Sequence, residues 1–369
     1  MTADDFPSGR LAAVHAAPAY LDRDRTVDKV ESLTGEAARA GARLVAYPEA
    51  FVPGFPVWCL VRRPIDQHRQ FEELYANSVE VPGAHTERLG QIAARHDVYL
   101  SVGITERSRV SMGGLFNANL VFAPSGRLVG HHRKLVATWA ERLVWAPGDG
   151  LGLVPIETDV GRVGVLICGE NTNPLARYTL MAQGEQLHIA TWPPAWPFTR
   201  GGDAGDYRRW IEVRSAAHAF EGKVFSLSVA AYLDESAIMG AAYGDVDAEQ
   251  ILREAPPAVS LAHGPSGELL AGPVQGEEGI LYLDADVRGT IVPKLAHDVI
   301  CGYQRFDVFD LHVNRVRPAP ATIRPGPASL GARPETTVDA DLITGVGQRA
   351  GHQRSDYLLE DGEKQRRPG

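Results

Sequence analysis

Residues 163–184 read VGVLICGENTNPLARYTLMAQG and contain the pattern on which the fold inference rests. The apolar run Val163 to Ile167 predicts a buried strand, and Cys168 follows it directly. After a short polar turn, Pro174 suits the first turn of a helix and Gly184 suits its end. A cysteine at the exit of a rigid strand lies where α/β proteins carry nucleophiles, although cysteine is also among the residues most often simply buried.

Apolar runs of the same kind recur along most of the chain. Further runs rich in Val, Ile and Leu, each predicting a strand, cover residues 11–17, 44–47, 98–104, 118–122, 187–191, 224–230, 258–262 and 280–283. Helical spacing predicts four buried helix faces, made of Val27, Val30, Leu33 and Ala37; Leu89, Ile92, Ala93 and His96; Leu175, Tyr178 and Ala182; and Trp210, Val213, Ala217 and Phe220. Strands that alternate with helices predict an α/β protein with helix-covered sheets, one layer on either side of about residue 150.

The composition favours one large globular domain and a small-molecule partner. The chain has 369 residues, of which 44% are apolar, and a net charge of -9 without a basic block, which argues against nucleic acid or an anionic membrane. Residues 1–18 carry acids where a signal peptide carries basic residues, and no window approaches the ~18 apolar residues of a membrane span. Three scattered cysteines, Cys59, Cys168 and Cys301, favour free thiols and a cytoplasmic location over a disulfide framework.

Two further stretches carry candidate catalytic groups. In YPEAFVPGFP (47–56), Glu49 follows an apolar strand, and burial there would raise its pKa and make it a usable base. In HHRKLVATWAERLVW (131–145), Lys134 and Glu141 stand among aromatic residues, a composition typical of a lined pocket. The simpler alternatives are a loop carboxylate that faces water and a basic run at a solvated sheet edge.

These three stretches together resemble the nitrilase superfamily of carbon-nitrogen hydrolases, whose catalytic residues are a Glu, a Lys and a Cys in this chain order. The resemblance implies that Glu49 is the base, Lys134 the stabilising cation and Cys168 the nucleophile. It also implies a second carboxylate at Glu141. It covers about residues 8–310 and implies a carbon-nitrogen hydrolase domain with a four-layer αββα sandwich fold.

Within the superfamily, the block 131–145 and the PGFP element resemble the nitrilase branch more than the amidases or carbamoylases. The candidate pocket residues are Phe55, Trp58, Trp139, Gly169, Glu170 and Trp192. One of them departs from the family pattern, because nitrilases typically carry CWEN where this chain has CGEN with Gly169. The loss of an indole beside the thiol is expected to enlarge or loosen the site.

The resemblance implies hydrolysis of a nitrile to a carboxylic acid and ammonia through a thioimidate and a thioester on Cys168. No cofactor is expected, and the dispersed histidines without an HExxH pattern predict no metal site. Two alternatives stay open: an amidase or carbamoylase that uses the same Glu, Lys and Cys, and a non-catalytic assembly protein. Nitrilases resemble one another in forming dimers and spiral filaments, so a homo-oligomer is expected.

The C-terminal part differs in composition from the rest. Residues 311–345 are rich in proline and predict an extended arm, whereas residues 346–369 are polar and charged and predict a mobile tail.

Overall fold

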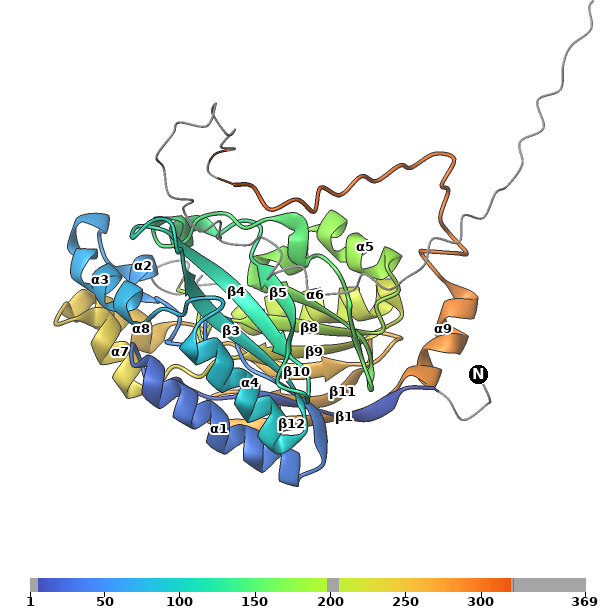
Figure 1. The fold of residues 1–369 in the computed structure, drawn as a ribbon, viewed down its shortest axis with the longest axis horizontal. Helices are drawn as coiled ribbons and strands as arrows, with labels where there is room; N and C mark the ends of the chain where they lie inside the picture. The colour runs from blue at the N-terminus through green and yellow to red at the C-terminus, as the bar shows by residue number, and fades with distance from the viewer. Residues whose placement is uncertain (1–5, 198–205, 320, 322–369) are drawn as a thin grey trace, which may run out of the picture. The chain divides into compact units, whose positions relative to one another are not determined.

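The computed structural model of the chain describes residues 6–197, 206–319 and 321, and their strands form two six-stranded sheets (Figure 1). The first sheet has the order β12-β1-β2-β3-β4-β5. Its strands are β1 (Ser8–His15), β2 (Ala42–Ala46), β3 (Tyr99–Arg107), β4 (Leu115–Phe122), β5 (Leu128–Arg133) and β12 (Gly279–Asp286). Strands β1, β2 and β3 are parallel, and the remaining pairs are antiparallel.

The second sheet has the order β11-β10-β9-β8-β7-β6, and the strand that precedes the cysteine, β7, lies next to the edge strand β6. Its strands are β6 (Ile156–Thr158), β7 (Gly161–Ile167), β8 (Leu187–Trp192), β9 (Phe225–Ala230), β10 (Ser260–His263) and β11 (Leu269–Val274). Strands β7, β8 and β9 are parallel, with Val163 opposite Leu187 and Ile167 opposite Thr191. Their carboxyl ends therefore lie at one edge of the sheet, which is where ligands bind in open α/β sheets.

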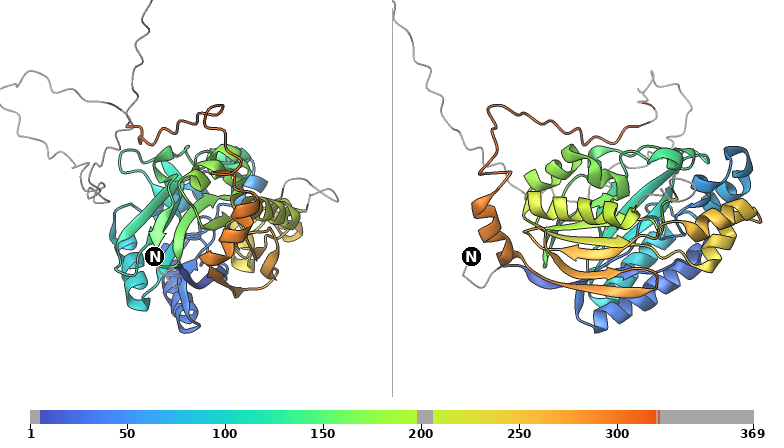
Figure 2. Two further views of the ribbon diagram at one scale, coloured as in Figure 1. Left: turned by 90° about the vertical axis from the view of Figure 1, so that its right-hand side faces the viewer. Right: turned by 180° about the vertical axis from the view of Figure 1, so that it is seen from behind.

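Helices cover the outer face of each sheet. The helices are α1 (Arg23–Arg39), α2 (Trp58–Val61), α3 (His68–Asn77), α4 (Ala84–His96), α5 (Pro174–Ala182), α6 (Tyr207–Gly222), α7 (Glu235–Ala242), α8 (Val246–Glu254) and α9 (Ile291–Ala296). In Figure 1, α1 and α4 lie in front of the strands, and the view from behind in Figure 2 has α5 and α6 in front. The fold is the four-layer αββα sandwich that the resemblance implied.

The alternation of side chains along β1 and β7 explains how the layers pack. On β1, Leu11 and Ala13 belong to the core between the sheets, whereas Ala12 and Val14 pack with the helices α1 and α4. On β7, Val163 and Val165 likewise enter the core between the sheets, and Leu166 packs against α5. Successive side chains of a strand point to opposite faces, so a strand buried on both faces must be apolar throughout.

Each of the nine predicted apolar runs contributes to an observed strand, but the sheets differ from the expectation in two ways. Strands β5, β6 and β11 were not predicted, because β5 contains His131, His132 and Arg133 and the other two are short or exposed. Strand β12, from the second half of the chain, pairs with β1 over Ser8 to His15 in the first sheet. The division at residue 150 is therefore correct for β1 to β11 and wrong for β12.

The predicted buried faces of α5 and α6 are wrong. Helix α5 buries Ala176, Thr179, Leu180 and Met181, while Leu175 is 61% exposed. Because most of this short helix is apolar, its periodicity does not single out one face. Helix α6 buries Ser215 and His218 beside Ile211 and Ala219, while Val213 and Phe220 are about half exposed. The buried polar residues have hydrogen-bond partners, so an apolar pattern could not find this face.

The described part of the proline-rich segment packs against the segment 149–153. Arg317 Nε lies 2.7 Å from Asp149 Oδ2, and Arg315 donates to the carbonyl of Leu151. Residues up to Ala319 belong to the same compact unit as the sheets. The rest of the predicted arm and the predicted tail, residues 320 and 322–369, lie outside the described residues. The boundaries at 310 and 345 stay predictions.

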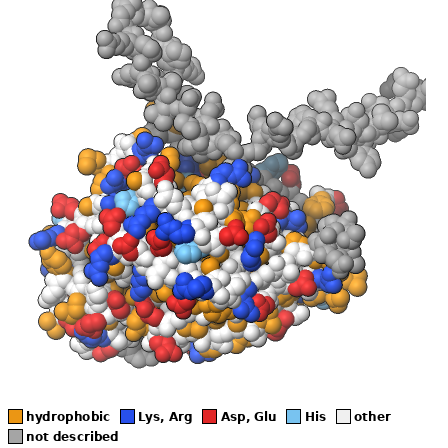
Figure 3. Space-filling model, turned by 60° about the horizontal axis from the view of Figure 1, so that its bottom comes forward, with side chains coloured by type: hydrophobic (Ala, Val, Ile, Leu, Met, Phe, Trp, Pro, Cys, Tyr) orange, Lys and Arg blue, Asp and Glu red, His pale blue; other side chains and the backbone are white. Residues whose placement is uncertain are grey.

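The exposed face in Figure 3 carries acidic and basic side chains interspersed rather than a field of one sign. Ion pairs between α1 and α4, such as Arg88 with Asp28 and Arg95 with Glu31, contribute to such mixed surfaces. Among the described residues, no helix is both long and apolar enough to cross a membrane.

Candidate active site

Cys168 directly follows β7 and begins the short 3-10 helix Cys168–Thr172, which leads into α5. The cysteine is 5% exposed and has a φ of 49°, in the left-handed region that residues other than glycine rarely adopt. Such backbone strain persists only where the surroundings hold it, and it clusters at functional sites. The first amides of α5 at Leu175 and Ala176 are occupied by the Asn173 side chain, so they are not free to assist the thiol.

Lys134 lies between the two predicted carboxylates. Its Nζ donates to Glu49 Oε1 at 2.7 Å and to Glu141 Oε2 at 2.6 Å. Glu49 follows β2, Lys134 follows β5, and Glu141 lies in the 3-10 helix Trp139–Leu143. Glu49, Lys134 and Glu141 are each at most 2% exposed. Glu49 is therefore not a loop carboxylate that faces water, and Lys134 is not part of a solvated sheet edge.

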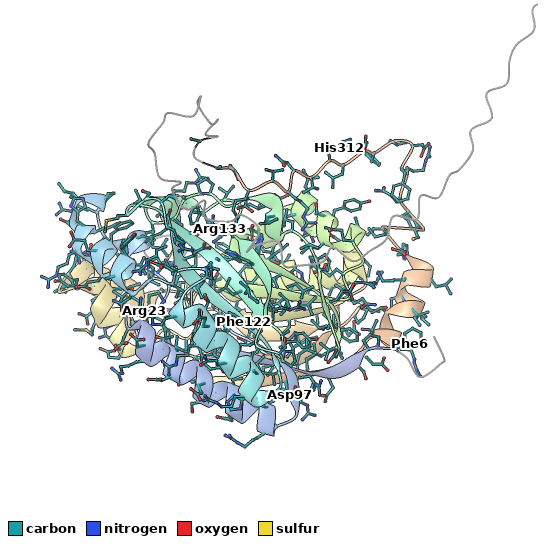
Figure 4. The ribbon with its side chains drawn as sticks, viewed as in Figure 1. Phe6, Arg23, Asp97, Phe122, Arg133 and His312 are labelled. Atoms are coloured by element: carbon teal, nitrogen blue, oxygen red, sulfur yellow. The ribbon has the colours of Figure 1, made fainter. Side chains whose placement is uncertain are left out.

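The nucleophile and both carboxylates form one cluster. A carboxylate oxygen of Glu49, one of Glu141 and Cys168 Sγ all lie within 4.8 Å of one another. The preceding residue on β5, Arg133, labelled in Figure 4, instead pairs with Glu106. Alternation along β5 thus sends Arg133 away from the site and Lys134 into it.

The charges of this cluster determine its resting protonation. Burial alone would lower the pKa of Lys134, but Glu141 and Glu49 raise it well above its ordinary value, so Lys134 is a cation. Burial raises the pKa of the Cys168 thiol well above its ordinary value, and the negative charge of the nearby Glu49 raises it further. Burial also raises the pKa of Glu49 to about 7, against the opposing effect of Lys134. The resting cysteine is therefore a thiol beside a base whose pKa suits proton transfer near neutrality.

Three residues that the sequence reasoning missed contact or adjoin this cluster. Asn117 Nδ2 donates to Glu49 Oε1 at 2.7 Å, and the Thr138 amide donates to Glu141 Oε2 at 2.8 Å. Tyr207, at the start of α6, belongs to the same buried cluster as Cys168, and burial followed by Cys168 raises its pKa. Asn117 is a polar residue within the apolar strand 115–122, a pattern that indicates a buried polar contact. No sequence pattern indicates the positions of Thr138 or Tyr207.

Glu170 was predicted as a pocket residue, and the structure places it in a supporting role. Its Oε1 accepts from the Leu135 amide, and its Oε2 accepts from the Ile167 amide and lies 2.9 Å from His132 Nε2. Both carboxylate oxygens are thus occupied by protein donors and are not available to a substrate. Glu170 instead ties the end of β5, next to Lys134, to the end of β7, next to Cys168.

Gly169 lies close to the side chain of Thr138. A Cβ built on Gly169 would lie 2.8 Å from Thr138 Oγ1, so the segment that carries Glu141 already occupies this position. A larger side chain at residue 169 would have to displace Thr138. The expectation of an enlarged or looser site concerns the space of a whole indole and stays a prediction.

The predicted aromatic pocket residues occupy different positions. Trp58 and Trp192 are fully buried in the cluster that contains Cys168, whereas Trp139 is 51% exposed. Phe55 packs edge-on against Trp145 and lines a small cavity beside Glu49. The lining of this cavity is mostly aromatic and aliphatic and consists of Pro18, Tyr20, Glu49, Phe51, Phe55, Pro194, Ala231, Tyr232, Leu233 and Ala237.

The carbon-nitrogen hydrolase family matches residues 10–291, which contain every residue of the cluster. The chain belongs to the carbon-nitrogen hydrolase family. A nitrilase of Paraburkholderia phymatum is 32% identical to this hydrolase over 93% of this chain and 97% of its own length. A nitrilase of Pseudomonas syringae is 33% identical over 85% and 92%, and an aliphatic nitrilase of Rhodococcus rhodochrous is 33% identical over 84% of each chain.

Solved structures agree on the fold of this hydrolase. A carbon-nitrogen hydrolase of Helicobacter pylori superposes with a TM-score of 0.63 at 20% identity, over 83% of this chain and 98% of its own. An amidase of Nesterenkonia superposes with a TM-score of 0.57 at 18% identity, over 76% and 91%. With these relatives, the chain is a cysteine-dependent hydrolase of the nitrilase type.

Two groups of side chains in the described part of this hydrolase have the composition of a metal site. In the first, made of Glu49, Glu141 and Cys168, the Lys134 ammonium already binds both carboxylates. In the second, made of Glu185, His188 and His218, one ring nitrogen of each histidine is hydrogen-bonded to an oxygen of Glu185.

Proposed function

We propose that this hydrolase converts an organic nitrile to a carboxylic acid and ammonia, with Cys168 as nucleophile, Glu49 as base and Lys134 as stabilising cation. The observation that carries the proposal is the buried cluster in which Lys134 binds Glu49 and Glu141 beside the Cys168 thiol. A cysteine hydrolase needs a base for the thiol proton and a cation for the charge that develops on the substrate.

In the first half-reaction, Glu49 takes the proton of the Cys168 thiol while Sγ bonds to the nitrile carbon. The nitrogen gains negative charge and takes a proton from the Lys134 ammonium. Glu49, 2.7 Å from Lys134 Nζ, returns its proton to the lysine. The product of this step is a neutral thioimidate, and the site has recovered its original charges.

In the second half-reaction, Glu49 takes a proton from water as the water oxygen bonds to the thioimidate carbon. Glu49 passes this proton to the nitrogen, the hydroxyl proton of the tetrahedral intermediate follows as the carbon–nitrogen bond breaks, and ammonia leaves. A thioester remains on Cys168. A second water adds in the same way and releases the carboxylic acid and the thiol. Two waters are consumed for each nitrile. Glu141 holds Lys134 in place and favours its charged form, so that the lysine regains its proton after each transfer.

The experiment that tests this function is a panel of nitriles and their matched amides, with ammonia release as the readout. We expect ammonia from at least one nitrile, with a larger kcat/KM than from the amide of the same carbon skeleton. Larger values for the amides across the panel would favour the amidase alternative. No release from either class would contradict hydrolysis as a function.

Cysteine labelling distinguishes an enzyme from the assembly-protein alternative. Cys301 is exposed and would react indiscriminately, so the measurement is made in a Cys301→Ser variant. Cys59 is then a matched control, because it is buried and burial also raises its pKa. With a positioned base beside it, Cys168 is expected to react with iodoacetamide about 10²-fold faster than Cys59. Equal rates would favour the scaffold.

Three further proposals accompany this function. The homo-oligomer, a dimer or larger and including spiral forms, stays a proposal that rests on the resemblance to nitrilases. The three free cysteines support a cytoplasmic location, where thiols stay reduced. We also retain residues 8–310 as the catalytic domain.

A further inference from the structure

A second buried cluster of ionisable side chains lies behind the nucleophile and takes no part in the proposed chemistry. Glu185, which follows α5, His188 on β8 and His218 on α6 are each at most 2% exposed. Glu185 Oε1 lies 2.7 Å from His188 Nδ1, and Glu185 Oε2 lies 2.8 Å from His218 Nε2. The two imidazole rings stack with centroids 3.6 Å apart.

This cluster reaches the nucleophile through Asn171. The Asn171 Nδ2 group donates to the carbonyls of Leu166 and Cys168, at 3.3 and 3.1 Å. Asn171 Oδ1 therefore points the other way, where it lies 2.8 Å from His188 Nε2. The carbonyl of the strained Cys168 is thus linked through Asn171 and His188 to Glu185.

The sequence leaves room for this arrangement at Gly164 on β7. A Cβ on Gly164 would lie within 2 Å of Glu185 Oε1, so any other residue would expel the carboxylate from its place. Gly164 and His188 are also register partners on neighbouring parallel strands. A glycine inside a central strand weakens the strand, and here it makes space for a buried charged group.

Counting donors and acceptors fixes the protons of the cluster. Because Asn171 Oδ1 can only accept, His188 Nε2 must carry a proton. An ionised Glu185 can only accept hydrogen bonds, one from each ring, so His188 Nδ1 must carry a proton as well. His218 Nδ1 has no partner among the described residues, so the His218 ring needs only the proton on Nε2.

The electrostatic environment agrees with this count. Burial would raise the pKa of Glu185, but the two histidines outweigh burial and lower it to about 2. Burial, followed by the neighbouring His188, lowers the pKa of His218 to about 4, which leaves His218 neutral. Arg177 on α5, which also acts on His218, is paired with Glu221. One charged ring stacked on one neutral ring avoids the repulsion of two cations.

We infer that His188 is a buried imidazolium, paired with Glu185, which orients Asn171 and so holds Cys168 in its strained, reactive conformation. His188, Glu185 and Asn171 are positioning residues, since they act through the backbone of the nucleophile. This inference rests on the proposed role of Cys168, and the tests below include two readouts that need no substrate.

Proton-detected NMR of the protein labelled with 15N histidine tests the protonation directly. We expect the His188 ring to show two bound protons, assigned through contacts of its Nε2 proton with the Asn171 amide. In Glu185→Gln the amide can donate to Nδ1, so the Nδ1 proton is expected to disappear while the Nε2 proton stays. A single proton on the His188 ring of the unmodified protein would overturn the inference, whether or not the variant folds.

Kinetics of Asn171→Ala test the positioning. Removing the side chain that holds the Cys168 carbonyl is expected to lower kcat by about 10²-fold and to change KM little, since small misplacements of a reacting group have effects of this size. The rate at which iodoacetamide alkylates Cys168 is expected to fall in parallel. Glu185→Gln, which keeps the contact with Asn171, is expected to lose less, about 10-fold.

The outcomes separate this inference from the proposed function. Unchanged alkylation in a folded Asn171→Ala protein would overturn the positioning role. A loss of thermal stability with kcat and the alkylation rate unchanged would show that the cluster only stabilises the fold, and would also overturn the positioning role. If the unmodified enzyme hydrolyses no nitrile, the proposed function fails, while the NMR and alkylation results still test the inference.

Discussion

Replacing Cys168 with alanine is expected to abolish ammonia release from every substrate that the unmodified protein hydrolyses. The thioimidate and the thioester both need a sulfur atom, which Cys168 supplies in this cluster, whereas Glu49 and Glu141 are paired with Lys134. Removal of a nucleophile from a comparable catalytic unit costs about 10⁶-fold in kcat. The residual rate is therefore expected to lie at the background of the assay, measured as ammonia released over many hours at high enzyme concentration.

The control for this loss is Cys59→Ala. Cys59 is the other buried cysteine, so its removal leaves a comparable cavity without touching the proposed chemistry. We expect Cys59→Ala to retain activity and Cys168→Ala to retain its fold, as measured by circular dichroism and thermal unfolding. The positive φ of Cys168 suggests that alanine fits the turn about as well as cysteine does. Substantial turnover by folded Cys168→Ala would end the proposal that Cys168 is the nucleophile.

The positions of the reactive groups could be predicted from the sequence because each group lies beside a strand. A run of apolar residues followed by Cys168 or Glu49 predicts a group at the end of a buried strand, and these two residues lie there. The role of Lys134 followed from the resemblance and not from its local pattern. Its strand, β5, reads HHR before the lysine, which is typical of an exposed edge, and only the pairing with β4 turns it inward.

The supporting contacts could not be predicted in the same way, because they depend on tertiary contacts between polar residues. Glu170 stands beside the cysteine in sequence, as a pocket residue would, yet its carboxylate binds two amides and His132. The buried position of His218 on α6 was not predicted, because an apolar periodicity cannot identify a buried histidine. Its partner Glu185 lies 33 residues away in the chain, and no spacing rule connects the two.

The structure identifies the neighbour of Gly169, the residue that stands where nitrilases typically carry tryptophan. The sequence indicates only that a large side chain is missing beside the thiol. The structure has Thr138 close to the place where that side chain would begin. Thr138 also donates its amide to Glu141, so the segment that fills the space is the one that holds the second carboxylate. Thr138 therefore adjoins both Gly169 and Glu141, which in turn binds Lys134.

Replacing Glu49 with glutamine is expected to lower kcat/KM by at least ~10³-fold, whereas the same change at Glu141 is expected to cost about 10-fold to 10²-fold. The two residues are a matched pair, since each is buried, each binds Lys134, and each loses one charge with little change in shape. They differ in their remaining contacts. Glu141 Oε2 also accepts from the Thr138 backbone, as a positioning group would.

The pH dependence distinguishes the roles of these two carboxylates further. Glu49 accepts the thiol proton only when it is ionised, and burial raises its pKa to about 7, so kcat/KM of the unmodified enzyme is expected to fall as the pH drops below about 7. Glu49→Gln removes the base, so its residual rate is expected to lose this acid limb. Glu141→Gln removes a negative neighbour that raises the pKa of Glu49, so its limb is expected to persist and to move to lower pH. Equal losses with identical pH profiles would contradict the assignment of Glu49 as the base, because two interchangeable carboxylates would then share one role, that of holding Lys134.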